Sequence, residues 1–503
     1  MKILSASQIK EADQYTINNE PISSVDLMER AANKCYLWLK EKFDNSFSFN
    51  IFVGLGNNGG DGLVVARKLA LEGYIVTLYV VRYAQNASED FDVNYERLKN
   101  ISGVQVVEIH EDTKLDFKAE INTVIVDAIL GNGLSKDVGG LIGKVISIMN
   151  SQNCIKVSID IPTGLYAENN DANKGVIFNA NYTLTFQQPK LSLLFPENYQ
   201  YVGDIVCLPI GLDLDYLKSL ESNSYFIEKE DVRFILKPRG KFDHKGMYGH
   251  ALIIAGSKGK VGAAILASKA CLRAGVGLLT THIPNCGYTA FQMAIPEAMC
   301  NADENDSYIT KLMDVSSFSS IAVGSGIGKE KQTVNMLKLL IQNSSVPLIF
   351  DADAINILAE NKTWLSFVPK GSIFTPHVGE FERLLGKKSS TFQRIQLAKE
   401  FCFKYSVYLI LKGAHSILVA PSGELFFNST GNPGMATGGS GDVLTGIISS
   451  LMAQGYSSRD ACIIAMYIHG LAGDFATYEK SMNSMIAGDI VDNLPKSFEY
   501  ILD

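Results

Sequence analysis

The feature that most constrains the fold of this 503-residue chain is a regular alternation of short apolar runs with amphipathic stretches. The runs at 49–55, 74–81, 123–129 and 156–161 are rich in β-branched residues, and the text between several of them has a helical pattern. Continuous runs of this kind predict strands that are buried on both faces of a parallel sheet. The sequence therefore predicts an α/β fold with a doubly wound, Rossmann-like sheet that ends around 204–212.

A second alternation of the same kind begins after a polar stretch at about 213–230, which we interpret as a linker. Runs such as 250–256 predict further strands, and 440–503 has a mostly helical pattern. The length of the chain also exceeds that of one ordinary domain. We therefore expect two α/β domains, residues 1–213 and residues 228–503.

Composition excludes several classes of protein. With 47% hydrophobic residues, a net charge of -8 and no basic stripe, the chain is not expected to bind nucleic acid. Its eight cysteines form no CxxC pair, which favours reduced thiols over a zinc site. The first residues lack the apolar core of a signal peptide, and no apolar run is long enough to span a membrane. We expect a cytoplasmic homo-oligomer that binds no membrane.

A glycine-rich loop, GLGNNGGDG at residues 54–62, follows the first predicted strand and opens a helix. Its GxGxxG pattern is common at tight turns between strand and helix, and alone it indicates little about function. Dinucleotide-binding dehydrogenases place an acidic residue at the end of the second strand, where this chain has Arg82. The sequence therefore disfavours a standard NAD dehydrogenase.

Oxygen-rich side chains stand at three predicted strand ends: Asn57, Asn58, Asp61, Asp127 and Asp160. Taken singly, Asp61 can favour a helix N-terminus, and the two other aspartates can be ordinary turn residues. Ligands of open α/β sheets bind beyond the carboxyl ends of the strands, where these side chains converge. Together they predict a binding site with enough oxygen atoms for a monovalent cation.

Four motifs of this half, GLGNNGGDG, VDAILGNGLS, SIDIPTG and TFQQPK, resemble in order and spacing the epimerase domain of the NAD(P)H-hydrate repair (YjeF-like) family. The resemblance covers residues 1–213 and implies that Asp160 contacts the substrate as acid or base, with Lys190 assisting. The K⁺ ligands that it implies are Asn58, Asp127 and Thr163. The residues implied to line the pocket for the hydrated nucleotide are Asn57, Asn58, Gly59, Gly60, Asp61, Gly131, Asn132, Gly133, Leu134, Ser135, Lys136 and Asp137.

The second half contains a longer glycine loop, GNPGMATGGSGDVLTG at residues 431–446, which runs into a predicted helix. A glycine loop at a helix N-terminus is suited to anions, yet this one contains the carboxylate of Asp442. So many glycines cost conformational entropy, and a close approach of the backbone to a ligand explains them best. A carboxylate fits there if it removes the proton of a hydroxyl that attacks a phosphoryl group. We therefore interpret Asp442 as a general base.

Other polar residues of this half also follow predicted strands. Asp351 and Asp353 end an apolar run, and their spacing predicts that both carboxylates point to the same side. His377 and Glu380 open a helix, where a capping box is the simpler interpretation. Lys412 precedes a glycine turn and, taken alone, predicts only a solvated side chain.

A base beside an anion-binding loop is compatible with two reaction types on a ribokinase-like fold. One is a small-molecule kinase, for example one that acts on a vitamin precursor, with the first domain as an accessory. The other is a dehydratase that phosphorylates a hydroxyl so that it can leave. The spacing of the residues alone does not choose between them.

Five motifs, which begin at HKGMYGHALIIAGSKGKVGAA and end at GNPGMATGGSGDVLTG, resemble in order the ADP-dependent NAD(P)H-hydrate dehydratases over about residues 228–500. This resemblance implies that ADP is the phosphoryl donor and that Glu380 helps to organise Mg²⁺. The substrate-binding residues that it implies are Ala263, Gly326, His377 and Asp442. The ADP-binding residues that it implies are Lys412, Gly413, Ala414, His415, Ser416 and Gly441.

The two resemblances together imply a bifunctional repair enzyme whose small-molecule partners are NADHX, NADPHX and ADP. The first domain would interconvert the R and S hydrates of the reduced cofactor. The second would restore NADH or NADPH from the S hydrate and leave AMP and phosphate. A non-catalytic nucleotide sensor would be expected to lack the base, and a first domain that serves only for interaction would not need the predicted cation site.

Overall fold

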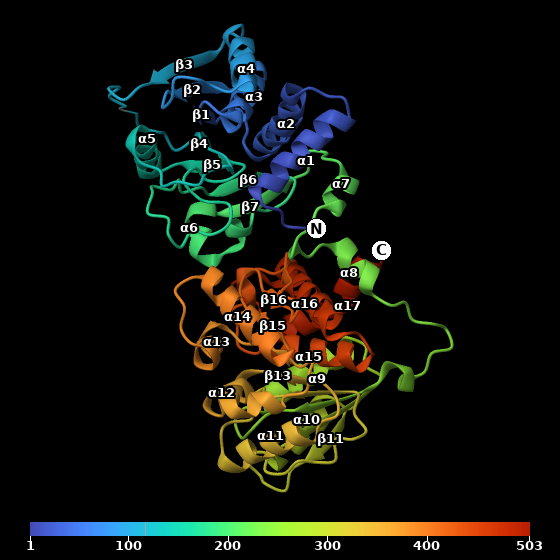
Figure 1. Ribbon diagram of the computed structural model, residues 1–503. Coiled ribbons are helices and arrows are strands. Elements are labelled where there is room, and N and C mark those ends of the chain that lie inside the picture. Colours follow the sequence, from blue (N-terminus) through green and yellow to red (C-terminus); the bar gives the residue numbers. More distant parts are fainter. Residues whose placement is uncertain (116) are drawn as a thin grey trace. The chain divides into compact units, whose positions relative to one another are not determined.

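The computed structural model describes residues 1–115 and 117–503. The chain divides into two compact units, Lys2–Ser222 and Asn223–Asp503, with Met1 belonging to the second unit (Figure 1). Both units are layered α/β structures, which agrees with the predicted α/β class.

The first unit contains a seven-stranded sheet in the order β3-β2-β1-β4-β5-β6-β7, in which every pairing is parallel. Strands β1 to β3 are added toward one edge of the sheet and β4 to β7 toward the other, which is the order of a doubly wound sheet. The prediction of a Rossmann-like fold is therefore confirmed. The strands are β1 (Ser48–Val53), β2 (Ile75–Val81), β3 (Val104–Ile109), β4 (Thr123–Ala128), β5 (Ile155–Ile159), β6 (Tyr182–Phe186) and β7 (Asp204–Leu208).

Helices cover both faces of this sheet because alternate residues of each strand point to opposite sides. In β1, Phe49, Ile51 and Val53 pack into the core that α2, α3 and α4 cover, whereas Phe52 packs into the core beneath α5. Figure 1 shows these helices around the strands of the first unit. The helices are α1 (Ala6–Asn19), α2 (Ser24–Lys42), α3 (Asn57–Leu71), α4 (Glu89–Lys99), α5 (Gly140–Ser151), α6 (Tyr199–Val202) and α7 (Leu214–Ser219).

The second unit contains a ten-stranded sheet in the order β11-β10-β9-β12-β13-β14-β15-β16-β17-β8. Strands from β11 to β15 pair in parallel, and β15, β16 and β17 form an antiparallel meander. The strands are β8 (Ser224–Phe226), β9 (His250–Ile254), β10 (Leu278–Ile283), β11 (Met299–Ala302), β12 (Ser320–Val323), β13 (Leu348–Phe350), β14 (Ile373–Phe374), β15 (Tyr408–Leu411), β16 (Ile417–Val419) and β17 (Leu425–Phe427).

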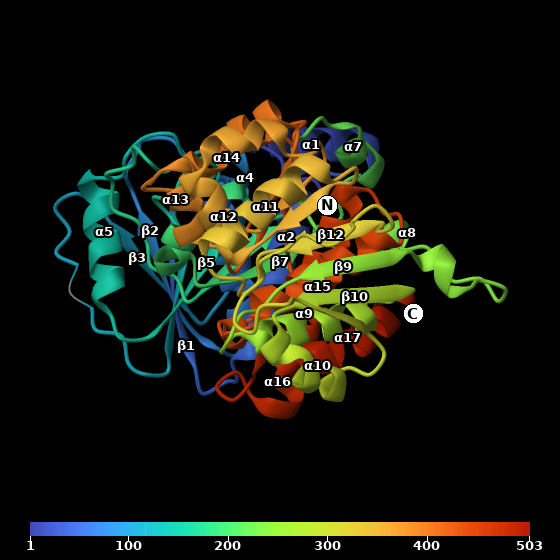
Figure 2. The same ribbon diagram turned by 90° about the horizontal axis from the view of Figure 1, so that it is seen from below.

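Two groups of helices cover this sheet. Figure 2 shows α11 to α14 on one side of β9 and β12, with α9, α10 and α15 to α17 on the other. The largest apolar core lies on the side of α9, α15, α16 and α17. The helices are α8 (Lys229–Ile235), α9 (Val261–Arg273), α10 (Tyr288–Ala294), α11 (Lys331–Asn343), α12 (Ala352–Glu360), α13 (Val378–Leu385), α14 (Thr391–Tyr405), α15 (Ser440–Ala453), α16 (Ser458–Lys480) and α17 (Ala487–Leu502).

The stretch predicted as a linker is ordered and is shared between the two units. Residues 214–219 form α7 of the first unit, where Asp213 caps the helix by accepting from the backbone N–H of Tyr216 at 2.8 Å. Residues 224–226 form β8, which pairs with β17 at the edge of the second sheet. The second unit therefore begins at Asn223, five residues before the predicted boundary. A three-residue strand has too little pattern to be recognised in sequence.

Candidate active sites

The first candidate site lies where the order of the first sheet reverses, beyond the carboxyl ends of β1 and β4. The two loops that leave these strands are in close contact, since a Cβ at Gly54 would lie 2.0 Å from the carbonyl oxygen of Ile129. A Cβ at Gly59 would likewise lie 2.0 Å from the carbonyl oxygen of Gly54. These glycines let the start of α3 approach the loop after β4, which explains the glycine-rich motif sterically.

Asn58, Gly131 and Asp160 meet in this crevice. A Cβ at Gly131 would be 3.3 Å from Cβ of Asn58 and 3.7 Å from Oδ2 of Asp160. The amide nitrogen of Asn58 donates to the carbonyls of Leu130 at 3.1 Å and Ile159 at 3.3 Å. Its Oδ1 is buried and has no hydrogen-bond partner. An unpartnered buried oxygen is suited to a bound cation.

Asp127 and Thr163 supply the other predicted cation ligands, and they contact each other directly. The Thr163 hydroxyl donates to Oδ1 of Asp127 at 2.6 Å, and the Thr163 amide donates to Oδ2 at 2.8 Å. The same hydroxyl lies 3.3 Å from the carbonyl oxygen of Leu130, which is also bonded to Asn58. Complete burial raises the pKa of Asp127 to about 6, against the lowering effect of these hydrogen bonds. A cation here would offset the desolvation of the carboxylate.

Asp160 and Lys190 form a buried ion pair. Lys190, 1% exposed, also donates to the Thr185 hydroxyl at 2.8 Å, so its ammonium is fixed from the β6 side. Asp160 has a φ of +66°, a left-handed backbone that is uncommon for residues other than glycine. Such strain persists where the surrounding structure imposes it, often at functional sites. The ion pair holds a carboxylate at the edge of the crevice.

Two further carboxylates interact electrostatically with Asp160. Burial and the charge of Asp160 raise the pKa of Asp61 well above its usual value. Burial and the same charge raise the pKa of Asp13, on α1, to about 6. Asp13 was not predicted as a site residue, because its position on an N-terminal amphipathic helix gives no sign that it faces the crevice. Asp61 and Asp13 thus lie near enough to Asp160 for its charge to raise their pKa values.

The predicted pocket loop 131–137 extends from this crevice to the surface. Gly131 contacts the crevice, but a Cβ at Gly133 would meet nothing within 4 Å. Asp137 is exposed and accepts a 2.6 Å hydrogen bond from the Tyr166 hydroxyl. The start of the loop, at Gly131, therefore lies close to Asp160. The places of Asn132, Ser135 and Lys136 in substrate binding stay predictions.

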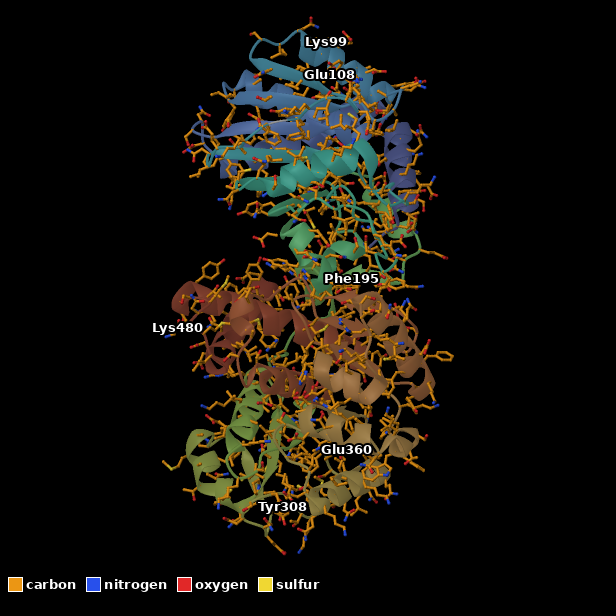
Figure 3. All side chains as sticks on the ribbon, turned by 90° about the vertical axis from the view of Figure 1, so that its left-hand side faces the viewer. Lys99, Glu108, Phe195, Tyr308, Glu360 and Lys480 are labelled. Atoms are coloured by element: carbon orange, nitrogen blue, oxygen red, sulfur yellow. The ribbon has the colours of Figure 1, made fainter. Side chains whose placement is uncertain are left out.

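Arg82, which occupies the position of the dehydrogenase acid, is engaged on the surface. Its guanidinium donates to both carboxylate oxygens of Glu108 on β3, at 2.5 and 3.0 Å, and lies over the ring of Tyr95. Figure 3 labels Glu108 on β3. The position therefore holds an arginine that is paired with a residue of the next strand. This differs from the acidic residue that binds the ribose in dinucleotide-binding dehydrogenases.

The second candidate site lies at the corresponding reversal in the second sheet, beyond the carboxyl ends of β9 and β12. The Gly256 amide donates to the Ser325 carbonyl at 2.8 Å, which joins the two loops. A Cβ at Gly326, whose φ is +66°, would lie 3.4 Å from Cβ of Ala263. Ala263 and Gly326, both predicted to bind substrate, are thus neighbours, and neither position has a side chain larger than a methyl group.

Asp351 organises the centre of this site. It accepts from Nζ of Lys412 at 2.6 Å, from the Thr375 hydroxyl at 2.8 Å and from the Ser325 hydroxyl at 3.3 Å. Asp353 instead binds the Gly328 amide at 2.9 Å, so the prediction that the two carboxylates point to the same side is wrong. The reason is that β13 ends at Phe350 and Asp351 begins α12, where residues two apart do not share a face.

Asp442 lies in the first turn of α15, next to this centre. Burial and the neighbouring charge of Asp351 raise its pKa to about 6, while Ser325 and Lys412 act in the opposite direction. A Cβ at Gly441 would lie 3.1 Å from Nζ of Lys412, so the predicted ADP residues Gly441 and Lys412 face each other. A carboxylate of this pKa can accept a proton near neutral pH.

The His377 and Glu380 pair forms the capping box that the simpler interpretation predicts. The His377 amide donates to Glu380 at 3.0 Å, and Nδ1 of His377 accepts from the Gly379 amide at 3.0 Å. The second carboxylate oxygen of Glu380 lies 3.3 Å from Nε2 of His377. Both oxygens of Glu380 therefore have partners, and its part in organising Mg²⁺ stays a prediction. The His377 side chain is mostly exposed, at the same sheet edge.

The predicted ADP turn, 412–416, joins β15 to β16. The Gly413 amide donates to the Ser416 hydroxyl at 3.3 Å, and Gly413 and Ala414 are exposed. Burial lowers the pKa of His415, and its Nδ1 lies 2.9 Å from the carbonyl oxygen of Asn428. Since a carbonyl only accepts, Nδ1 carries the proton and His415 ties the turn to the end of β17. The contact of this turn with ADP stays a prediction.

The described residues include no group of three or more His, Cys, Asp or Glu side chains arranged to hold a metal ion. No helix among them is both long and apolar enough to cross a bilayer.

Two stretches of the chain match known families. Residues 24–192 match the YjeF-related protein N-terminus, and residues 251–496 match the NAD(P)H-hydrate dehydratases. The chain is 33% identical over 510 residues to the bifunctional NAD(P)H-hydrate repair enzyme of Moorella thermoacetica, with 98% of this chain and 96% of that protein covered. The chain belongs to the bifunctional NAD(P)H-hydrate repair enzymes.

Other members of the family align over the same length. The Escherichia coli enzyme is 32% identical, with 98% of this chain and 93% of that protein covered. A ribokinase-like protein of Enterococcus faecalis superposes on 56% of this chain and 98% of its own, at 25% identity and a TM-score of 0.50. The predicted family, its two activities and the ribokinase-like fold of the second domain are thereby confirmed.

Proposed function

We propose that the second domain of this repair enzyme dehydrates the S hydrate of NADH or NADPH at the expense of ADP, with Asp442 as the general base. The observation that carries this assignment is the position of Asp442 in the first turn of α15, where burial and Asp351 raise its pKa to about 6. A base must be partly deprotonated at working pH and must reach the nucleophile.

The proposed reaction has two steps, phosphoryl transfer to the substrate hydroxyl and elimination of phosphate. The substrate hydroxyl attacks the terminal phosphorus of ADP, its proton passes to Asp442, and the bond from that phosphorus to the AMP oxygen breaks. Lys412 and the amides at the start of α15 stabilise the charge on the moving phosphoryl group. In the second step the carbon–oxygen bond breaks, phosphate leaves with the electron pair, and the neighbouring ring carbon loses a proton. The products are NAD(P)H, AMP and phosphate.

Mg²⁺ in this proposal accompanies the phosphates of ADP, as it commonly does when a protein supplies few ligands. Glu380, which forms a capping box with His377, would help to organise the ion.

The first domain, in the same proposal, interconverts the R and S hydrates at the hydroxyl-bearing carbon. Asp160 exchanges a proton with the substrate, and the Lys190 ammonium holds the carboxylate in place. Asn58, Asp127 and Thr163 would hold a K⁺ ion; the buried, unpartnered Oδ1 of Asn58 supports this assignment. The ion would supply positive charge next to the substrate, and its ligands would keep the loop after β4 in position.

The state of the cysteines bears on where the enzyme acts. All eight cysteines carry free thiols, as expected for a protein of the reducing cytoplasm. We propose that the enzyme acts there as a homo-oligomer on NADHX, NADPHX and ADP, without nucleic acid or membrane. Analytical ultracentrifugation of the purified chain would give the number of subunits.

The test uses a mixture of R and S hydrates of NADH with the purified protein, Mg²⁺ and K⁺. The return of reduced-nicotinamide absorbance is followed with ADP, with ATP and without nucleotide. Full recovery with release of AMP and phosphate supports both assignments. Recovery that stops at the S fraction contradicts the epimerase assignment. A stable phosphorylated product without phosphate release would instead favour the ribokinase-like kinase alternative.

A further inference from the structure

Helix α16 contacts both ends of the glycine loop that precedes α15. Near one end, Oδ2 of Asp474 accepts from the Gly431 amide and Oδ1 accepts from the Asn432 side chain, each at 2.9 Å. At the other end, Nε2 of His469 lies 3.0 Å from the carbonyl oxygen of Ser440 and 3.3 Å from its hydroxyl. One helix face therefore holds the two ends of this loop.

The same face carries glycines that allow the contact. A Cβ at Gly470 would lie 2.3 Å from the Thr430 hydroxyl, and a Cβ at Gly473 would lie 2.3 Å from Sδ of Met435. Neither glycine has a positive φ, so the backbone alone does not require them. Close approach of loop and helix does require them.

The protonation state of His469 follows from its partner. A carbonyl oxygen only accepts hydrogen bonds, so Nε2 carries the proton and donates it to Ser440. Burial lowers the pKa of His469 to about 4, so the ring is neutral throughout the pH range in which the enzyme works. His469 is therefore a fixed neutral donor and has no part in proton transfer.

Anchoring the Ser440 carbonyl also fixes the next amide. The Ser440–Gly441 peptide is planar and trans, so the Gly441 N–H points opposite to the Ser440 C=O. That amide belongs to the residue that faces Nζ of Lys412. Residue 439 before it is a glycine with φ +93°, which offers little resistance to rotation of this turn. The hydrogen bond from His469 is a contact from outside the loop that helps to keep this peptide in its orientation.

We propose that His469 is a positioning residue of the dehydratase: its hydrogen bond to the Ser440 carbonyl aims the Gly441 amide at the transferred phosphoryl group and sets the position of Asp442. This inference rests on the proposed phosphoryl-transfer role of Asp442. Asp474 holds the opposite end of the loop, so His469 acts on the half that adjoins the reacting groups.

The test replaces His469 in the full-length chain by either of two residues with an amide side chain, glutamine or asparagine. Nε2 of glutamine can occupy the place of Nε2 of histidine, whereas the shorter asparagine cannot reach the Ser440 carbonyl. We expect H469N to lower kcat of the dehydratase by about tenfold to a hundredfold, the cost of a small misplacement of reacting groups. We expect H469Q to retain most of the rate. The pH profile of H469N should keep its acid limb at about 6, since Asp442 still titrates.

The control is another buried histidine of the same domain. His282 on β10 contacts the carbonyl oxygens of Asn301 at 3.1 Å and Lys311 at 3.2 Å, away from the glycine loop. H282N removes a comparable donor and should lower thermal stability without the selective loss of kcat. The epimerase rate of each variant, measured on the same chain, shows that the first domain is folded.

Calorimetric titration with ADP adds a second measurement. H469N should bind ADP several-fold more weakly than the wild type, and H469Q with nearly wild-type affinity. Equal kcat and equal ADP affinity in H469N and H469Q would overturn the proposal. The function proposed for Asp442 fails separately, if D442N keeps dehydratase activity whatever the behaviour of the His469 variants.

Discussion

Lys412 and Asp351 form an ion pair, with Nζ 2.6 Å from Oδ1, at the end of two strands that are separated by β14 in the sheet. Asp351 is 2% exposed and has two hydroxyl donors besides the lysine. The pair therefore does two things in the site. It fixes the cation opposite Gly441, and it brings a negative charge near Asp442.

The D442N variant should lose the dehydratase reaction and gain stability. Because the folded protein raises the pKa of this carboxyl to about 6, ionising it above pH 6 costs folding free energy. Removing the charge should stabilise the second domain by about 1–3 kcal/mol at pH 7.5. Thermal unfolding at pH 7.5 and pH 4.5 checks this, since the gain should shrink as pH falls below 6. A less stable D442N at pH 7.5 would contradict the raised pKa.

The dehydratase rate should fall on the acid side with an apparent pKa of about 6, because a protonated Asp442 cannot accept the hydroxyl proton. Asp351 raises this pKa, so D351N should move the acid limb of kcat to lower pH. Its matched control is D353N. Asp353 accepts from the Gly328 amide, and its Oδ2 lies 3.8 Å from Nζ of Lys260, so it is paired with a different lysine from Asp351. A kcat profile measured from pH 4.5 to 8.5 should shift for D351N alone.

The K190M variant should abolish epimerisation and leave dehydration intact. It removes the ammonium from a buried ion pair, so Asp160 loses its partner and the first domain should lose about 3 kcal/mol of stability. With mixed hydrates and ADP, recovery of NADH should stop at the S fraction. Adding wild-type epimerase domain should complete it. Full recovery by K190M alone would show that Lys190 is dispensable.

The K⁺ requirement should be confined to the epimerase. Dialysis into potassium-free buffer should slow interconversion of the hydrates and leave the dehydratase rate on pure S hydrate unchanged. T163V removes a hydroxyl that contacts both Asp127 and the Leu130 carbonyl, and it should weaken the apparent affinity for K⁺ at least about tenfold. Titration of the epimerase rate with KCl measures this. An unchanged half-saturating KCl concentration in T163V would contradict the site.

Much of the fold was predictable because its signals are local. Each buried strand is one apolar run, and each site loop contains glycines directly after such a run, as at Gly54 and Gly256. The doubly wound order then follows from the alternation of strand and helix. For the same reason the crevice residues Asn58, Asp127 and Asp160 could be placed at one sheet edge before the structure was known.

The parts that could not be predicted depend on contacts between residues far apart in the sequence, or on the exact residue at which a strand ends and a helix begins. The role of Asp351 depends on where β13 stops, because one residue decides whether its carboxyl follows a strand or begins a helix. Asp13 and His469 lie on helices that have no motif, and only the tertiary structure turns them toward Asp160 and Ser440. A helical pattern tells which face is apolar, but not which neighbour a polar residue will meet.

The three-residue strand β8 has a practical consequence for separating the two activities. It pairs with β17 through Tyr225, whose ring centroid lies 5.0 Å from that of Phe426, and covers β17 as the outermost strand of the second sheet. A dehydratase fragment cut at residue 228 would leave the edge of 425–427 unpaired and apolar, a template for intermolecular strand addition. A fragment that starts at Asn223 keeps β17 covered by β8, and is the one to express when the dehydratase is wanted by itself.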